Sequence, residues 1–289
     1  MNDTTPNFGT AGAGDLFYKQ GYKSSHEVPE FLSTLGLTAF EYQCGRGVRI
    51  GDEKAKVLGE NARKHQVALS LHAPYYISLT TDDPEKIANN LRYFRESAHA
   101  ATQMGATRVV FHSGSVGKKA NRREAFQMAY AALQHIIHTL NNEGYHQLIF
   151  CPETMGKMNQ LGDLEEVLEF CKISDNLLPC IDFGHLNSRM QGAITATKDV
   201  QQIFDRISQV IGEEKANRIH CHFSKIEYGP GGEKKHLTFA DDVYGPPFEP
   251  LIELLVKKAY TPTIICESAG TQAEDAKAMW ETYKEFSSL

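Results

Sequence analysis

The residues Pro179-Cys180-Ile181-Asp182-Phe183-Gly184-His185 carry a carboxylate and an imidazole at the end of an apolar run. That run begins at Leu177, and His185 follows Asp182 by three residues. A parallel strand that is buried on both faces requires such near-continuous apolar character. Parallel barrels place their chemistry at the C-terminal ends of their strands. The stretch therefore predicts a buried strand that ends in two potential ligands.

The same order of apolar run, polar end and helical segment recurs along the chain. It predicts strands over residues 7–14, 39–43, 67–71, 108–111, 147–153, 177–181, 218–223 and 263–267. Helices are expected over 28–35, 52–65, 83–104, 121–141, 163–171, 199–211, 248–259 and 271–286, a flexible loop up to residue 22 and irregular chain over 227–247. Eight such units predict an α/β protein with one (β/α)8 TIM-barrel domain over residues 1–289. A doubly wound open sheet is the alternative.

The composition describes a globular protein without general affinity for polyanions. The 289 residues include 30 Lys and Arg against 36 Asp and Glu, which gives a net charge of −6. Any affinity for phosphate must therefore be local. The six cysteines are scattered and are expected to be reduced thiols. Residues 1–6 lack the features of a secretory signal, and no apolar run reaches about 18 residues. We therefore expect a cytoplasmic protein that does not enter a membrane.

Side chains with metal-binding chemistry stand at the predicted ends of six strands. Because the ends of barrel strands converge on one rim, these residues should lie close together. Imidazoles and carboxylates suit Zn²⁺, or Mn²⁺ and Fe²⁺ where oxygen ligands dominate. They exceed what one ion can use, which predicts two or three ions. The candidates are His72, His112, Glu153, Asp182, His185, His220, His222 and Glu267, with His236 in the long loop after the seventh strand.

Any one of these histidines, taken alone, is more often a hydrogen-bonded core or rim residue than a ligand. The full set at strand ends favours a metal site instead. His220 and His222 leave an alternative open, because residues two apart on a strand face the same way. Both can point into the barrel, and only one of them is needed as a ligand.

Several short motifs in this order resemble the metal-binding motifs of endonuclease IV, a family of apurinic/apyrimidinic endonucleases among the xylose-isomerase-like TIM barrels. The motifs are Leu71-His72-Ala73-Pro74-Tyr75-Tyr76-Ile77, Phe111-His112-Ser113-Gly114-Ser115, Cys151-Pro152-Glu153-Thr154, Cys180-Ile181-Asp182-Phe183-Gly184-His185 and Ile265-Cys266-Glu267. The resemblance runs from about residue 39 to residue 267. It implies three zinc ions and cleavage of the phosphodiester 5′ to an abasic deoxyribose.

The resemblance also implies a role for each ligand. His72 and His112 would hold one zinc ion, and Glu153 would bridge it to a second and serve as the catalytic carboxylate. Asp182, Glu267 and a histidine of the seventh strand would complete the second site. His220 matches best when Lys225 is the anchor, but a one-step slip gives His222. His185 and His236 would hold the third ion.

The chain departs from the family pattern at three places. Lys234 stands where the family has an Asp two residues before the loop histidine, and only Glu233 offers a carboxylate nearby. The N-terminal Gly-Ala-His-Val-Ser signature of the family is replaced by Phe8-Gly9-Thr10-Ala11-Gly12, and the second loop is altered. A DNA-facing rim is still expected from basic and aromatic residues, namely Tyr75, Tyr76, Arg46, Lys118 and Lys225.

Two functions fit these residues. The first is a metal-dependent phosphodiesterase like endonuclease IV, acting as a monomer on abasic-site DNA. The alternative is a sugar isomerase or epimerase with one divalent metal held by Glu153, Asp182, a histidine of the seventh strand and Glu267. The discriminating feature is the pair of His72 and His112, which a dinuclear site needs and the isomerase chemistry does not.

Overall fold

Eight parallel strands form the centre of the protein. The structure is a computed structural model that describes residues 4–117 and 121–288. The strands follow the order β5-β4-β3-β2-β1-β10-β7-β6, and every neighbouring pair is parallel. Their bounds are β1 Asn7–Ala11, β2 Ala39–Gln43, β3 Ala68–His72, β4 Arg108–Phe111, β5 Ile149–Pro152, β6 Cys180–Asp182, β7 His220–Phe223 and β10 Thr263–Cys266.

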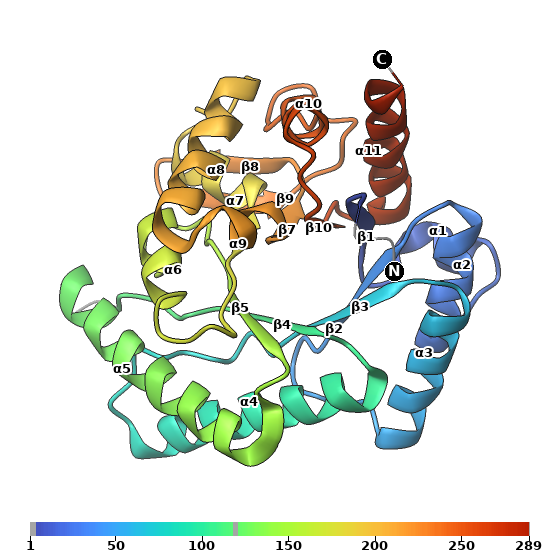
Figure 1. The fold of residues 1–289 in the computed structure, drawn as a ribbon. Helices are drawn as coiled ribbons and strands as arrows, with labels where there is room; N and C mark the ends of the chain where they lie inside the picture. Colours follow the sequence, from blue (N-terminus) through green and yellow to red (C-terminus); the bar gives the residue numbers. More distant parts are fainter. Residues whose placement is uncertain (1–3, 118–120, 289) are drawn as a thin grey trace.

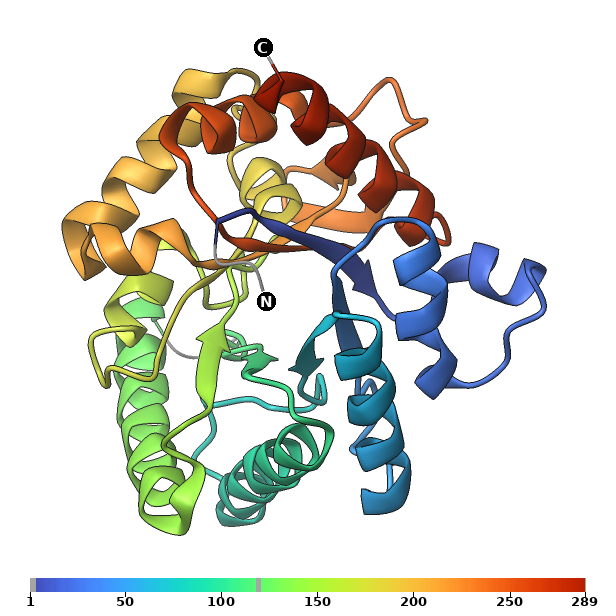
Figure 2. The ribbon, with the colours of Figure 1, turned by 45° about the vertical axis from the view of Figure 1, so that its right-hand side comes forward.

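The sheet curls until its two edge strands meet. Parallel bridges join Phe150 to Leu177 and Glu153 to Cys180, which closes the barrel between β5 and β6. Helices surround the strands (Figures 1 and 2). They are α1 Gly14–Lys19, η1 Ser25–Glu27, α2 Val28–Thr34, α3 Asp52–Lys64, α4 Pro84–Met104, α5 Arg122–Leu140, η2 Asn141–Tyr145, α6 Leu164–Phe170, α7 Phe183–Arg189, α8 Thr197–Ile211, α9 Glu213–Asn217, α10 Glu249–Lys258 and α11 Gln272–Ser287.

Local sequence signals explain where the longest helix begins and ends. The Asp83 side chain accepts hydrogen bonds from the backbone N–H of Glu85 and Lys86, and Pro84 occupies the first helical position of α4. Gly105 ends α4 with a φ of 72°, a left-handed conformation that glycine adopts without strain. The apolar face of α4 buries Phe94, which packs at 4.8 Å between ring centroids on Phe111 of β4.

The predicted TIM barrel is confirmed, and its eight strands are those that the apolar runs indicated. Two local predictions were wrong, and one helix lies where no element was predicted. A short helix, α1, occupies part of the expected flexible loop, and the unpredicted helix α7 begins directly after Asp182. The expected irregular segment over 227–247 contains an antiparallel hairpin of β8 Ile226–Gly229 and β9 Gly232–His236. That the domain extends over residues 1–289 stays a prediction.

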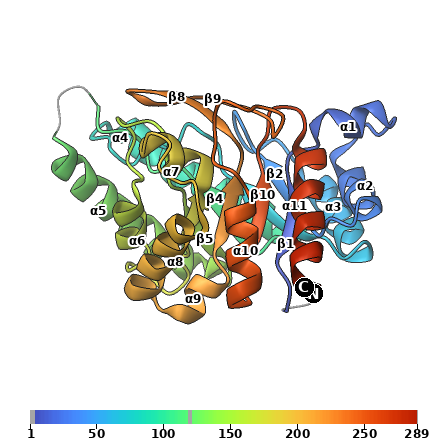
Figure 3. The same ribbon diagram turned by 90° about the horizontal axis from the view of Figure 1, so that it is seen from above.

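The two ends of the barrel differ in what covers them. Figure 3 shows the β8–β9 hairpin at one end, while β1 begins and α11 ends at the other. The hairpin follows β7, so it lies at the C-terminal ends of the parallel strands. Within the described residues, no helix combines the length and apolar character that crossing a bilayer requires. The loops and strand ends beneath the hairpin are therefore where the candidate ligands meet.

Replacing Gly9 with Ala should destabilise the barrel. A Cβ on Gly9 would lie 1.8 Å from the carbonyl oxygen of Ala39 on the neighbouring strand β2, so the backbone must shift. We expect a loss of about 1–3 kcal/mol, measured as a lower midpoint in chemical denaturation and a lower Tm. The control is Gly231→Ala, because a Cβ there meets nothing within 4 Å. Equal midpoints for the two variants would contradict this role of Gly9.

Candidate metal centre

Five of the barrel strands deliver a polar side chain to the same rim at their C-terminal ends. His72 is the last residue of β3, and His112 follows β4 directly. Glu153 follows β5, Asp182 ends β6, and Glu267 follows β10. The strands that lead to these residues are buried, and their parallel direction brings all the C-terminal ends together. Residues far apart in the sequence thus become neighbours.

Glu153 lies at the centre of this group, and only 1% of the residue is exposed. Its Oε2 atom is 3.1 Å from Nε2 of His72 and 3.0 Å from Nε2 of His112. Its Oε1 atom is 3.2 Å from Nδ1 of His185 and 3.3 Å from Nδ1 of His222. The two oxygens of one carboxylate therefore face two different pairs of imidazoles. This is the arrangement that a carboxylate shared by two cations requires.

The rim residues form three clusters that could hold cations. In each cluster, one ligand atom per residue lies within 4.8 Å of the others. The clusters are His72, His112 and Glu153; Glu153, Asp182, His222 and Glu267; and His185, Glu233 and His236. Glu153 belongs to the first two. The nitrogen and oxygen donors suit Zn²⁺, and they also suit Mn²⁺ or Fe²⁺.

Asp182 provides a test of whether a cation fits the second cluster. Its side chain is fully buried, and within the described residues its Oδ2 atom has no hydrogen-bond partner, while Nδ1 of His185 lies 3.2 Å from it. Its other oxygen, Oδ1, accepts the backbone N–H of His185 at 2.7 Å. An unsatisfied buried carboxylate oxygen is costly, and a cation at this position would satisfy it. The donor set and this free lone pair therefore fit a bound metal ion.

His222 rather than His220 reaches this second cluster. Nδ1 of His222 lies 3.6 Å from Oε1 of Glu267, in addition to its contact with Glu153. His220 is two residues earlier on β7, about 6.6 Å deeper in the barrel at the usual strand rise. There its Nε2 atom lies 2.9 Å from Oε2 of Glu41. Both histidines point inward, but they sit in different layers.

The third cluster uses Glu233, which the sequence motifs did not assign. Oε2 of Glu233 lies 3.5 Å from Nε2 of His185, and the rings of His185 and His236 lie 5.4 Å apart. The β8–β9 hairpin can approach this closely because two glycines face each other. A Cβ on Gly232 would lie 2.1 Å from the carbonyl oxygen of Gly156, and a Cβ on Gly156 would lie 2.6 Å from Cβ of Glu233.

A turn signal in the sequence could have revealed this hairpin. The run Gly229-Pro230-Gly231-Gly232 separates two short segments, which is typical of a hairpin connection. His236 ends β9 instead of lying in a loop, and Glu233 precedes it on the same strand. A carboxylate thus stands beside His185 and His236 although the Asp of the family pattern is replaced by Lys234.

Mutual electrostatic stabilisation shifts the pKa values of the central groups. Burial alone would raise the pKa of Glu153, but the charges of His112 and His222 hold that pKa well below its usual range. Burial would lower the pKa of His72, but the hydrogen bond and charge of Glu153 raise it to about 9. The pKa of His185 is raised to about 10, because Asp182 and Glu153 outweigh its burial. These imidazoles hold protons that a cation would have to displace.

The residues predicted to face DNA differ in whether their side chains are exposed or bound to the chain itself. Tyr75 and Tyr76 are about half exposed, with ring centroids 4.4 Å apart, and Arg46 is also exposed. The ammonium group of Lys225 instead donates hydrogen bonds to the backbone carbonyls of Phe239 and Asp241. Lys225 therefore anchors a loop of the chain. Lys118 lies outside the described residues.

Comparisons with known proteins place this geometry in context. A family model described as xylose isomerase-like TIM barrel matches residues 29–285. An uncharacterized protein of Methanocaldococcus jannaschii is 31% identical over 278 residues, which cover 96% of this chain and 97% of that protein. A probable endonuclease 4 of Acholeplasma laidlawii is 26% identical over 195 residues, 66% of this chain and 63% of that protein.

Two solved structures share the fold at low sequence identity. Endonuclease IV from Thermus thermophilus matches with a TM-score of 0.65 and 18% identity, covering 97% of this chain and 98% of that chain. D-psicose 3-epimerase with D-tagatose, from Clostridium cellulolyticum, also matches with a TM-score of 0.65, at 12% identity and covering 92% and 94%. Since the two enzymes are named for different reactions, the shared fold alone does not select a reaction.

Binding of Zn²⁺ at pH 7.5 should release about three protons per chain, one each from His72, His185 and His222. The pKa values of His72 and His185, about 9 and 10, lie above this pH, and the pKa of His222 is also raised well above its usual value, so all three rings are protonated when no cation competes. The apparent affinity should therefore rise with pH up to about 10, because protons and cations compete for the same nitrogens. Calorimetry of the chelator-treated protein in buffers of different ionisation enthalpy measures the release. A binding enthalpy that is independent of the buffer would contradict the prediction.

Glu233→Ala should remove one ion and leave the other two. His185 and His236 would lose the carboxylate that completes their cluster, while the two clusters around Glu153 keep all their donors. Elemental analysis after zinc reconstitution measures the stoichiometry. Glu227→Ala is the matched control, since Glu227 lies on the same hairpin and pairs with Lys234 and Lys235. Identical zinc content in the two variants would remove Glu233 from the site.

Proposed function

The chain belongs to the xylose isomerase-like TIM barrel family and resembles its endonuclease 4 members, and on this premise we propose that it is a metal-dependent phosphodiesterase that cleaves DNA 5′ to abasic sites. The two clusters that share Glu153 are the main support for this function. The charge of the centre and the exposed aromatic residues near the rim agree with it.

The carboxylate of Glu153 belongs to two clusters. Oε2 of Glu153 faces His72 and His112, and Oε1 faces His185 and His222. A pair of cations joined in this way can hold the attacking and the leaving oxygen of an in-line displacement at phosphorus. An isomerase that works with one cation has no need of the cluster of His72 and His112. The pair of His72 and His112 therefore favours phosphoryl chemistry.

The charge of the centre also favours an anionic substrate. Four carboxylates take part in the three clusters, Glu153, Asp182, Glu267 and Glu233. Three divalent cations would bring six positive charges against these four negative ones, which leaves about two positive charges on a chain of net charge −6. Such a local excess attracts a phosphodiester, whereas a neutral sugar gains little from it.

An aromatic pair lies close to the rim in sequence and offers a means to recognise a gap in a duplex. Tyr75 and Tyr76 follow His72 by three and four residues and keep about half of their surface exposed. An abasic site lacks one base, so inserting an aromatic ring there costs less unstacking than in intact DNA. Arg46 is exposed as well and supplies a positive charge for the backbone.

The alternative proposal is a sugar epimerase, favoured by the cluster of Glu153, Asp182, His222 and Glu267. These four donors could hold one divalent cation without the other clusters. For either reaction we propose a monomer in the cytoplasm. All six cysteines are buried and unbridged, a state typical of a reducing compartment.

We expect the zinc-loaded protein to cut an abasic duplex, leaving a 3′-hydroxyl, and Glu153→Gln to lose at least about a hundredfold in rate. The amide keeps the size of the side chain but lacks the charge that two cations share, which accounts for several kcal/mol in the transition state. Strand cleavage of a labelled abasic duplex measures the effect. Glu169→Gln is the control, because Glu169 pairs with Lys172 at the surface of α6.

The same assay separates the two proposed functions. An intact duplex and a panel of ketoses are incubated beside the abasic duplex with Zn²⁺ and with Mn²⁺. Cleavage of the abasic strand that is abolished by a chelator and weakened by salt supports the phosphodiesterase. Epimerisation of a ketose without strand cleavage would overturn it in favour of the alternative.

A further inference from the structure

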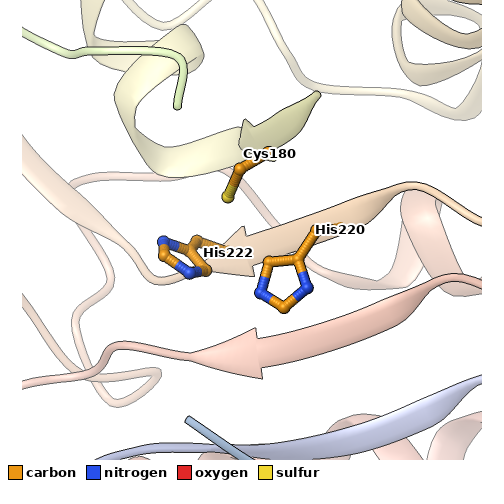
Figure 4. A group of neighbouring side chains, drawn as sticks. All are labelled: Cys180, His220 and His222. Carbon is orange, nitrogen blue, oxygen red and sulfur yellow. The ribbon is translucent and has the colours of Figure 1, made fainter. Parts of the chain in front are cut away.

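A second polar layer lies beneath the metal clusters. Figure 4 shows His220 and His222 projecting from β7 and the thiol of Cys180 pointing toward them from β6. All three side chains are fully buried, and their donor atoms lie within 4.8 Å of one another. By distance alone, this group is another candidate cation site. Its hydrogen bonds decide against that interpretation.

Both ring nitrogens of His220 are already engaged. Nδ1 lies 3.3 Å from Nη1 of Arg108, and a guanidinium can only donate, so Nδ1 accepts. Nε2 therefore carries the proton and donates it to Oε2 of Glu41 at 2.9 Å. Arg108 is itself fixed by the carbonyls of Arg218 and Ile219. His220 thus has no lone pair left for a cation, and the layer is a hydrogen-bonded support.

Glu41 accepts three of the hydrogen bonds in this layer. Oε2 accepts from Ser70 and His220, each at 2.9 Å, and Oε1 accepts from the amide of Gln43 at 3.1 Å. Oε1 also lies 2.9 Å from Nε2 of His222, although off the line of its N–H bond. Three donors and the Nε2 atom of His222 converge on two oxygens of a fully buried residue, which is the environment of an ionised carboxylate.

We propose that Glu41 is a positioning residue of the metal centre, which keeps the proton of His222 on Nε2 and so presents Nδ1 to the cation. The inference rests on the metal centre of the proposed function. Nδ1 faces Oε1 of Glu153 at 3.3 Å and Oε1 of Glu267 at 3.6 Å, while Nε2 faces Glu41. Metal-binding histidines commonly donate their second N–H to a carboxylate, which fixes the tautomer and the ring orientation.

The support extends across three strands of the barrel. Arg108 begins β4, His220 begins β7, and Glu41 lies on β2. Arg108 orients His220, His220 orients the carboxylate of Glu41, and Glu41 orients His222. His220 is therefore a positioning residue as well, at one remove from the cation.

Glu41→Gln tests the proposal. The amide has the size of the carboxylate, but one of its two ends can only donate, so it cannot accept from both histidines. We expect the affinity for one zinc ion to fall about 10–100-fold, measured by competition with a chelator, while the other ions bind as before. The visible absorption of the Co²⁺-loaded protein should change as well, which a merely structural role would not cause. Ser70→Ala, which removes a donor to Glu41 without touching His222, should resemble the unmodified protein.

The outcomes separate this proposal from the function on which it rests. Zinc affinity and a Co²⁺ spectrum that are unchanged in Glu41→Gln would overturn the role of Glu41 and leave the metal centre intact. An unmodified protein that binds no zinc would overturn the centre itself. If Glu41→Gln does not fold, ¹⁵N NMR of the histidines in the zinc-loaded unmodified protein decides. A proton on Nε2 of His222 supports the proposal, and one on Nδ1 overturns it.

Discussion

The contact of one buried carboxylate with four imidazoles is the constraint on which the rest of the site depends. Glu153 can bring its two oxygens to His72, His112, His185 and His222 only because β5 ends at the point where β3, β4, β6 and β7 also end. A charge buried to this degree is costly without opposite charge around it. The barrel therefore has to close so that these strand ends meet at one rim, and the bridge from Glu153 to Cys180 lies where β5 and β6 close it.

Depth within the barrel separates two tasks among similar side chains. His222 lies at the level of Glu153 and faces the clusters, while His220 lies one layer below and faces Glu41. Both ring nitrogens of His220 in the lower layer have partners, whereas in the upper layer Oδ2 of Asp182 has no hydrogen-bond partner among the described residues. The upper layer, in which Asp182 keeps an acceptor oxygen available, suits a cation, whereas His220 in the lower layer has no lone pair left to bind one. The same residue type thus has two different environments on one strand.

Solved structures that share this fold are named for two kinds of chemistry, an endonuclease and an epimerase, and the clusters of this chain bear on the choice between them. The set of Glu153, Asp182, His222 and Glu267 suffices for one cation. Glu153 also belongs to the additional cluster with His72 and His112. Glu233 on the hairpin forms a third cluster with His185 and His236, at the place where Lys234 replaces the Asp of the family motif. Because each added ligand arrives on a separate strand end or loop, the fold can gain or lose a cation without rearranging its core.

The sequence alone determined the barrel and showed that the candidate ligands lie at the C-terminal ends of its strands. Near-continuous apolar strands and capped helices follow from local residue patterns. It also indicated His72, His112, Glu153, Asp182 and Glu267, since each directly ends or follows such a strand. Only the tertiary structure placed His222, and not His220, beside Glu153, brought Glu233 to His185 on a hairpin, and revealed Glu41 beneath the clusters. The reason is physical: a strand pattern gives the face on which a side chain lies, but not its depth or its partners from distant strands. Those depend on barrel register and on close contacts such as that of Gly232 with Gly156.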